Sequence, residues 1–293
     1  MIIAKIFGGL GNQMFQYAAG KSFAFKNNSE LKLDINHYKI KTLPHGLPYR
    51  TYDLSIFKIK EDIATDKEIA RFKNDSTDFI KRNIRKAENM ISPHKIIYEP
   101  YFHYYSGWNS MKGNIYIDGY WQSEKYFNDI EDVIRKEFEI KTTLTKEGNA
   151  MIEKIQDSNS ICLNIRRQEF ASNPHLNLFT GVEYIYKAVD YINNKVRNPH
   201  YFIFSDELDW VKQHVKLSQP FTIVENNLYG DKFRDCLYLM SSCKHFIIPN
   251  STFGWWSAWL NPKAEKMVVA PQRWFSDDKR NTKDLIPEKW IRL

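Results

Sequence analysis

Short apolar runs, each followed by polar residues, alternate with helical patterns along the chain. Residues 2–7 are apolar and β-branched and run into Gly8-Gly9, and a pattern rich in Phe, Ala and Tyr predicts a helix over 14–26. Residues 31–34 predict a second strand. This strand–loop–helix–strand order is typical of α/β folds with parallel sheets.

The same alternation resumes at residue 115 and continues to residue 270. We expect strands at 115–120, 160–165, 200–205, 245–249 and 266–270, and helices at 123–138, 183–196 and 231–242. A chain of 293 residues is long enough for about two domains of roughly 150 residues each. We therefore predict one domain over 1–145 and a second over 146–293.

The net charge of +7 suits an anionic partner, such as a nucleotide diphosphate, an acidic lipid surface or a nucleic acid. A nucleic-acid binder is disfavoured, because the charge is spread out and no recognised binding module is present. The three cysteines form no C-x-x-C pair, which indicates reduced thiols in a cytoplasmic protein.

The longest stretch without a charged residue covers residues 245–262. Pro249, Asn250 and Gly254 are among the residues that interrupt it, so we predict a strand, a polar loop and a buried helix rather than a membrane span. No targeting segment is visible at the first residues. We expect a cytoplasmic location with at most peripheral contact at the inner face of the membrane.

Several familiar motifs are incomplete. Gly20-Lys21-Ser22 lacks the earlier glycine of a phosphate loop. The string from Gly9 to Met14 lacks the third glycine of a dinucleotide fingerprint, because Met14 stands in its place. The chain has no H-E-x-x-H motif and no D-x-D pair of the kind that holds Mg²⁺ or Mn²⁺ in many sugar transferases. We expect no metal and no cofactor.

The first candidate site is the string Gly8 to Gln13, between the first strand and the first helix. Glycines let a ligand approach the backbone, and the N–H groups at a helix N-terminus favour an anion or a sugar hydroxyl. Asn12 and Gln13 add side-chain amides beside Gly11. A tight turn that packs glycines against a neighbour explains the string equally well.

The second candidate site follows the strand at 160–165. Arg166 and Arg167 stand where solvated charges are unusual, and a guanidinium fork binds a diphosphate through two parallel hydrogen bonds. The alternative is a structural ion pair with Glu169 or Asp206. Ser205 and Asp206 end another strand, and the Asp206 carboxylate can accept two N–H groups from the edge of guanine. The alternative for Asp206 is the N-cap of a helix that starts near Leu208.

A third string, Asn250-Ser251-Thr252-Phe253, supplies an amide and two hydroxyls at the start of a helix, which makes a second phosphate site. The spacing of Trp255, Trp256 and Trp259 favours core packing over stacking on sugars.

Four strings together resemble the α-1,2-fucosyltransferases of glycosyltransferase family 11, in order and over nearly the whole chain. They are residues 8–17 (GGLGNQMFQY), 119–127 (GYWQSEKYF), 204–206 (FSD) and 250–256 (NSTFGWW). The resemblance implies a GT-B-type α/β fold, with two Rossmann-like domains whose parallel sheets face a cleft. It places the acceptor side on the N-terminal domain, 1–145, and the binding of the GDP-sugar donor on the C-terminal domain, 146–293. It also implies GDP-β-L-fucose as donor, a galactoside-type glycan acceptor that is free or lipid-linked, inversion to an α-linkage, and no metal.

The resemblance also implies roles for single residues. Arg166 matches the arginine that holds the β-phosphate, Asp206 the acid that reads guanine, and Asn12 an amide near the glycosidic oxygen. Ser251 and Thr252 match hydroxyls beside the phosphates. We count Arg166, Asn12 and Glu169 as catalytic candidates, with Glu169 as the candidate base. The substrate-binding candidates are Gly11, Gln13, Asn164, Arg167, Ser205, Asp206, Asn250, Ser251, Thr252 and Phe253.

The chain departs from the family's His-x-Arg-Arg-x-Asp signature at one place. Asn164 stands for the histidine, and Gln168-Glu169 follow the two arginines in place of Gly-Asp. Asparagine can hydrogen-bond a base or a ribose but cannot transfer a proton. Two rivals stay open: a transferase that uses another nucleotide sugar or makes another linkage, and a carbohydrate-binding protein without catalysis. The paired arginines argue against the second, because neutral sugars do not need them.

Overall fold

The computed structural model describes residues 1–39, 50–73, 94–167, 181–276 and 279–293. It divides into two compact units. The first comprises Met1–Glu139 with Asn281–Leu285, and the second comprises Ile140–Arg280 with Ile286–Leu293. The division along the chain falls at 139/140 rather than at 145/146, and a short C-terminal segment returns to the first unit.

The first unit holds a parallel sheet in the order β2-β1-β4-β3. Its strands are β1 (Ile2–Lys5), β2 (Leu31–Asp34), β3 (His94–Tyr98) and β4 (Asn114–Asp118). The strand order reverses between β1 and β4. Ligands of open parallel sheets bind outside the carboxyl ends of the strands at such a reversal.

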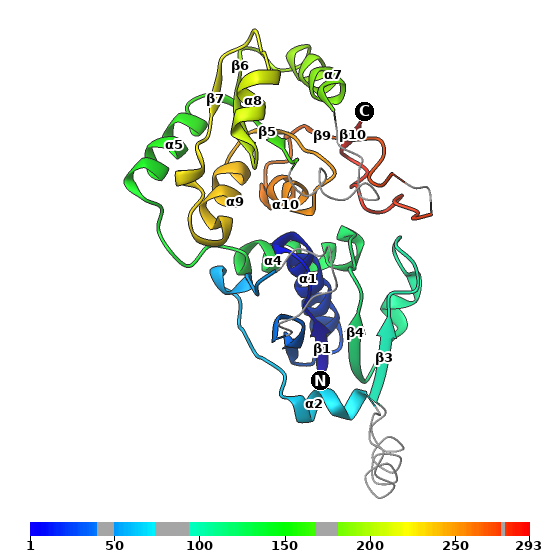
Figure 1. The fold of residues 1–293 in the computed structure, drawn as a ribbon. Helices are drawn as coiled ribbons and strands as arrows, with labels where there is room; N and C mark the ends of the chain where they lie inside the picture. The colour runs from blue at the N-terminus through cyan, green and yellow to red at the C-terminus, as the bar shows by residue number, and fades with distance from the viewer. Residues whose placement is uncertain (40–49, 74–93, 168–180, 277–278) are drawn as a thin grey trace, which may run out of the picture. The chain divides into compact units, whose positions relative to one another are not determined.

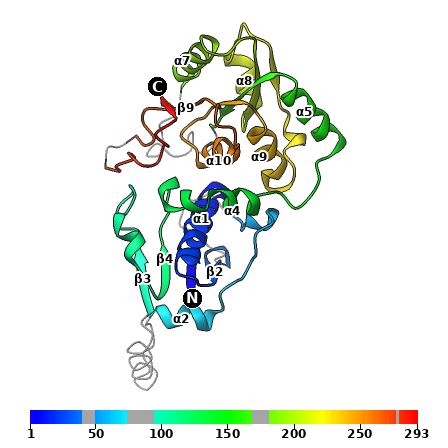
Figure 2. The same cartoon turned by 180° about the vertical axis from the view of Figure 1, so that it is seen from behind.

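Helix α1 (Leu10–Lys26) runs along this sheet, as both ribbon views show (Figure 1, Figure 2). Gly20 permits the approach, because a Cβ there would lie 3.0 Å from the Cβ of Ala4. Helix α2 (Asp66–Phe72) starts with a capping box between Thr65 and Glu68.

The helix that we predicted over 123–138 is broken in the structure. Ser123 caps a 3₁₀ turn (Glu124–Tyr126), a second turn covers Asn128–Ile130, and helix α4 covers only Glu131–Glu137. Phe127, at φ −144°, separates the two turns and is buried. Burial of that ring outweighs the helical pattern.

The second unit holds a parallel sheet in the order β10-β9-β8-β5-β6-β7. Its strands are β5 (Asn159–Ile165), β6 (Pro199–Ser205), β7 (Phe221–Ile223), β8 (His245–Ile247), β9 (Val268–Ala270) and β10 (Ile291–Arg292). The order reverses between β5 and β8, so the second unit also has a ligand position of this kind.

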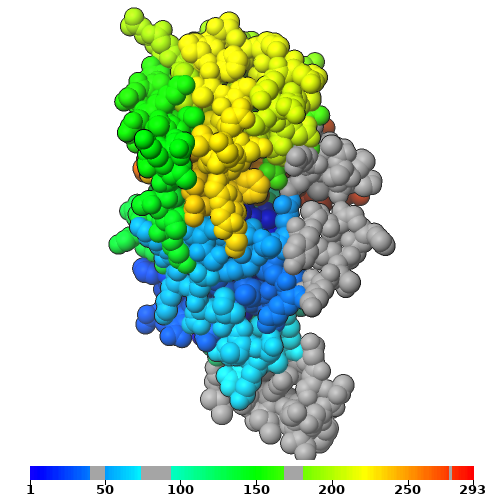
Figure 3. All heavy atoms as spheres, turned by 60° about the vertical axis from the view of Figure 1, so that its left-hand side comes forward, coloured from blue at the N-terminus to red at the C-terminus, as the bar shows by residue number. Residues whose placement is uncertain are grey.

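Helices cover the sheet of the second unit. They are α5 (Lys146–Gln156), α7 (Val182–Asn193), α8 (Leu208–His214), α9 (Arg234–Ser241) and α10 (Thr252–Leu260). Side chains of β5 alternate between its faces, since Ile161 and Leu163 join the core with α7 whereas Cys162 meets Cys243 just beyond α9. In the space-filling view, α5 and the segment from β6 to α9 lie side by side, coloured green and yellow (Figure 3).

The uncharged stretch at 245–262 forms β8, a polar loop and α10, as predicted. Trp255, Trp256 and Trp259 are buried, which confirms their core role. Within the described ranges, no helix is both long enough and apolar enough to cross a bilayer.

Candidate active site

Arg166 and Asp206 meet where β5 and β6 end. The Arg166 Nε lies 3.2 Å from the Asp206 Oδ2, and the Arg167 backbone N–H donates to the Asp206 Oδ1 at 2.9 Å. Asp206 is therefore not the cap of α8, where Glu207 occupies the capping position. The ion pair that we weighed as an alternative is present, and it fixes the orientation of the Arg166 guanidinium at the carboxyl edge of the sheet.

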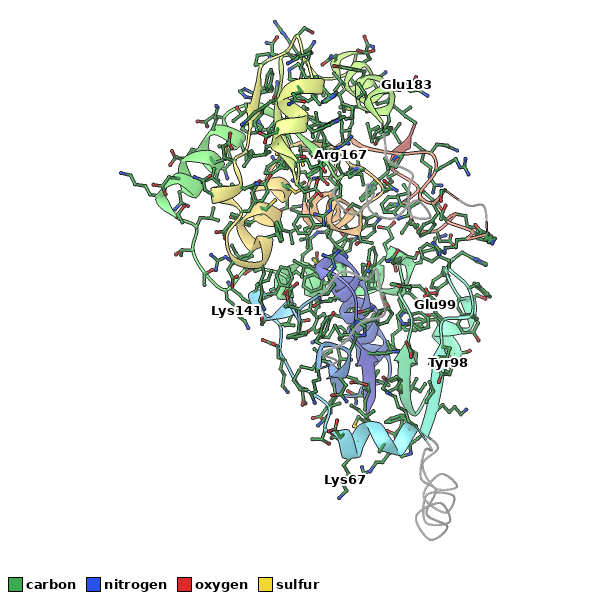
Figure 4. All side chains as sticks on the ribbon, viewed as in Figure 1. Lys67, Tyr98, Glu99, Lys141, Arg167 and Glu183 are labelled. Carbon is green, nitrogen blue, oxygen red and sulfur yellow. The ribbon has the colours of Figure 1, made fainter. Side chains whose placement is uncertain are left out.

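Arg167 is held by a separate set of contacts. Its Nε donates to the Glu207 Oε2 at 2.8 Å, and its guanidinium lies 4.1 Å from the ring centroid of Trp210. That ring stacks on His214. An ion pair and a cation–π contact together restrict this side chain, so the second arginine helps to shape the end of β5. Figure 4 labels Arg167 within the second unit.

Asn164, near the end of β5, and Asn250, just beyond the neighbouring strand β8, each have a buried side-chain oxygen. The Nδ2 of Asn164 donates to the Phe204 carbonyl at 3.3 Å, and that of Asn250 donates to the Trp274 carbonyl at 3.1 Å. Among the described residues, neither Oδ1 has a hydrogen-bond partner. A buried acceptor without a donor costs about 1–3 kcal/mol, so a hydroxyl or N–H donor from a ligand would be favourable here.

Ser205 supports the backbone next to Asp206 through hydrogen bonds. Its N–H donates to the Tyr229 hydroxyl at 3.1 Å, and that hydroxyl donates to the Ser205 carbonyl at 3.1 Å. Burial raises the pKa of Tyr229 and keeps the phenol protonated, as this donor role requires. The Ser205 hydroxyl accepts from the Glu207 N–H at 3.0 Å, so these contacts set the turn that carries Asp206.

Ser251, Thr252 and Phe253 lie at the start of α10 and are partly exposed. Ser251 occupies the capping position, yet its side chain makes no capping hydrogen bond within the described part of the chain. The N–H groups of a helix start suit a phosphate. The Phe253 ring lies 6.4 Å from that of Phe233.

In the first unit, α1 begins at Leu10 with Gly9 as its cap. Gly11, Asn12 and Gln13 thus lie in the first turn of the helix rather than in the loop where we placed them. Gly8 needs its φ of +79°, and a Cβ there would lie 2.8 Å from the Asn12 Nδ2. The helix starts early because the N–H groups of Asn12 and Gln13 both donate to the Gly9 carbonyl, at 2.9 and 3.1 Å.

Asn12 and Gln13 have different roles in the structure. The Gln122 Nε2, beyond the end of β4, donates to the Asn12 Oδ1 at 2.9 Å across the β1/β4 reversal. Gln13 is 0% exposed, and its amide donates to the carbonyls of Gly8 and Thr51 and accepts from the Asp53 N–H. Gln13 holds the loop together, whereas the Asn12 side chain is bonded to Gln122 at the β1/β4 reversal, and its role in ligand binding stays a prediction.

Sequence reasoning missed Glu99 and Arg50 in this region. Glu99 follows β3, and its carboxylate accepts from the backbone N–H groups of Tyr120 at 2.8 Å and Trp121 at 3.0 Å. Arg50 lies beside the α1 start, since a Cβ on Gly9 would be 3.8 Å from its Cζ. An acid directly after a strand was the available signal for Glu99, but the strand β3 was not predicted.

Glu169, the candidate base, and Gln168 lie outside the described residues. In the part of the chain that the structure describes, no group of three or more His, Cys, Asp and Glu side chains could hold a metal ion. Both the base and the metal-free mechanism stay predictions.

Comparison with known proteins identifies relatives along the full chain. An α-1,2-colitosyltransferase of Escherichia coli is 32% identical over 100% of this chain and 99% of its own length. An O-antigen biosynthesis glycosyltransferase of Escherichia coli, WbnK, is 30% identical over 98% of both chains.

Among solved structures, the fucosyltransferase NodZ from Bradyrhizobium aligns with a TM-score of 0.50 at 15% identity, over 89% of this chain and 92% of NodZ. NodZ co-crystallised with GDP gives the same TM-score of 0.50 at 14% identity and the same coverage. This likeness confirms the predicted GT-B-type α/β fold.

The family model described as glycosyl transferase family 11 matches residues 1–293. The chain is a glycosyltransferase and belongs to family 11.

Proposed function

We propose that the protein is an inverting α-1,2-fucosyltransferase that moves L-fucose from GDP-β-L-fucose to a galactoside-type glycan. The observation that carries this proposal is the position of Arg166. It stands at the β5/β8 reversal, oriented by Asp206, at the same sheet edge as the start of α10. A cation and a helix N-terminus at one edge suit a departing diphosphate.

In the proposed reaction, the acceptor hydroxyl attacks the anomeric carbon of the donor as the bond to the diphosphate oxygen breaks. Arg166 and the α10 N–H groups stabilise the negative charge that grows on GDP. Glu169 takes the proton of the hydroxyl, and Asn12 is the residue that the family resemblance assigns to the new glycosidic oxygen. No step needs a metal.

The relatives support this proposal. One is an O-antigen glycosyltransferase, and NodZ was co-crystallised with GDP. We accordingly propose a GDP-sugar donor and a glycan acceptor, free or lipid-linked, at the inner face of the membrane.

A second candidate donor is GDP-colitose, because the relative with 32% identity over the full chain is named for colitose. Colitose is fucose without its 3-hydroxyl group, so the same diphosphate site would serve both sugars. The difference between the donors concerns only the pocket for the sugar ring.

The test is incubation with GDP-fucose or GDP-colitose and an array of galactosides, with the linkage of the product read by NMR. Arg166→Ala should lower the rate about 10²–10³-fold, the usual cost of losing one charge-stabilising donor. Arg197→Ala removes an exposed arginine beyond α7 and serves as the matched control, with a normal rate. Turnover of Arg166→Ala at the control's rate would contradict the assignment.

A further inference from the structure

Two exposed tyrosines follow strands at the carboxyl edge of the first unit's sheet, and one of them, Tyr120, lies two residues before the Gln122 that contacts Asn12. Tyr101 follows β3 and Tyr120 follows β4, and each is 41% exposed. One face of the Tyr101 ring stacks on the His103 ring at 4.0 Å between centroids, so only its other face is offered to a sugar. The two strands are paired in register up to Tyr98 and Asp118. Both tyrosines therefore follow adjacent strands at the edge where a ligand of this sheet would lie.

Glu99 fixes the loop that carries Tyr120. Its two carboxylate oxygens accept the successive N–H groups of Tyr120 and Trp121. The fit is close, because a Cβ on Gly119 would lie 2.4 Å from the Glu99 Cβ. Trp121 adopts a left-handed φ of +54° and is 1% exposed, so the loop has one buried side and one open side. A buried left-handed residue persists only where its surroundings hold it.

The same loop reaches the catalytic candidate Asn12. Gln122, two residues after Tyr120, donates to the Asn12 Oδ1, and the Tyr120 ring packs edge-on against Phe7 at 4.9 Å. Figure 4 shows Glu99 and Tyr98 together at the end of β3. One loop therefore connects an exposed aromatic ring, a carboxylate anchor and the amide of the proposed reaction centre.

We propose that Tyr120 and Tyr101 form the platform that binds the acceptor sugar, and that Glu99 is the positioning residue of this platform. The inference rests on the proposed function, which it deepens by placing the acceptor. Tyrosine offers an apolar ring face and a polar tip, which matches a pyranose with C–H groups on one face and hydroxyls at its rim. Both oxygens of the Glu99 carboxylate already accept backbone N–H groups, so this acid does not attract a cationic ligand to the platform. The platform therefore suits a neutral galactoside.

The test measures acceptor and donor parameters separately in the full chain. We expect Tyr120→Ala and Tyr101→Ala to raise the acceptor KM about tenfold or more, with the donor KM and the acceptor-independent hydrolysis of the GDP-sugar unchanged. Tyr120→Phe should stay near wild type if the ring face does the binding. Tyr238→Ala is the matched control, since Tyr238 is also 41% exposed but lies on α9.

Glu99→Gln keeps the shape of the side chain but turns an NH₂ group toward one of the two N–H donors. We expect a raised acceptor KM with an unchanged donor KM, and partial rescue by Glu99→Asp. A far-UV circular dichroism spectrum and thermal unfolding of each variant separate this effect from loss of the fold. An acceptor KM within twofold of wild type in folded Tyr120→Ala and Glu99→Gln would overturn the inference.

Binding of lactose, observed by saturation-transfer NMR, tests the platform without catalysis. If the wild type turns over neither GDP-sugar, the proposed function fails, and the platform is judged on lactose alone. Loss of saturation transfer in Tyr120→Ala but not in Tyr238→Ala supports the platform. Equal transfer in both variants rejects it.

Discussion

Glu99 has a high pKa for a carboxyl group. Burial raises its pKa from an ordinary 4.5 to about 7, although the N–H groups of Tyr120 and Trp121 oppose the shift. The neighbouring Tyr126 also has a raised pKa, mainly from burial, and stays neutral. The ionised form of Glu99 is thus disfavoured in the folded chain relative to the unfolded chain.

This shift predicts a pH dependence of stability. The folded state holds the Glu99 proton more tightly, so its contribution is fully present below about pH 4.5 and is lost as the pH rises through 7. Glu99→Gln cannot titrate. The free energy of unfolding of wild type, measured in urea, should therefore fall relative to that of Glu99→Gln between pH 5 and pH 8. A difference that stays constant over this range would contradict the prediction.

Substitution of Asn164 should affect the binding of GDP more than it affects the stability of the fold. The Asn164 Oδ1 is buried without a donor among the described residues, so Asn164→Ala removes an unfavourable group together with one hydrogen bond to Phe204. We expect a melting temperature within a few degrees of wild type and a reduced stabilisation by GDP in thermal-shift measurements.

Asn261 is the control for this prediction. It is equally an asparagine at the end of an element, but its amide donates to the carbonyls of Ser241 and Cys243 and its Oδ1 accepts from Lys263. Asn261→Ala should lower the melting temperature and leave the shift caused by GDP intact. If Asn164→Ala keeps the full shift, its Oδ1 does not face the nucleotide.

At the scale of elements, the start of α9 stores backbone strain. Lys232 and Phe233 are consecutive left-handed residues, and Phe233 is 53% exposed. Each non-glycine residue in this conformation costs about 1–2 kcal/mol. The Phe233 ring lies 6.2 Å from that of Tyr229, which is bonded to the backbone beside Asp206.

Glycine substitutions of Lys232 and Phe233 should therefore differ in their effect on the Kd for GDP. Lys232→Gly should raise the free energy of unfolding by up to about 1 kcal/mol without changing the Kd for GDP. Phe233→Gly relieves the same strain but removes a ring that lies beside Tyr229 and beside the substrate-binding candidate Phe253, so the Kd for GDP should rise severalfold. Calorimetric titration with GDP measures both, and an unchanged Kd in Phe233→Gly would show that the ring has no part in nucleotide binding.

The sequence predicted those strands and helices that have one clear apolar pattern of their own. The strands at 160–165 and 200–205 and the tryptophans of α10 follow from apolar runs and helical spacing, and all are observed. The helix over 123–138 failed because tertiary burial of Phe127 overrides a local pattern. β3 was missed because its residues are only partly buried, so His94–Tyr98 has no continuous apolar run.

The candidate site was predictable only in part, for a related reason. Polar residues after strands located the edge that carries Arg166, Asp206 and Asn250. The partners of those residues come from distant segments, as when Gln122 meets Asn12, and no local pattern records such a pairing. Glu99 is the extreme example, because its importance comes from two backbone N–H groups in the loop after another strand.

At the scale of the whole molecule, the C-terminal segment is divided between the two compact units. Asn281–Leu285 belongs to the first unit, where Asp284 binds the Lys125 Nζ at 2.7 Å and accepts from the Tyr104 N–H at 3.0 Å. Ile286–Leu293 belongs to the second unit, where Trp290 contacts the Trp255 ring at 5.4 Å.

Single substitutions in this segment should consequently loosen one unit at a time. Asp284→Ala leaves the Tyr104 N–H without its acceptor and should speed amide exchange around residues 104–126. Trp290→Ala removes a half-buried ring from the Trp255 cluster and should lower the stability of the second unit by about 1–2 kcal/mol, with faster exchange around residues 255–270. Hydrogen exchange read by mass spectrometry on intact protein resolves both regions. If either substitution speeds exchange equally in both units, the units unfold as one cooperative body, and the division of the C-terminal segment between them has no energetic meaning.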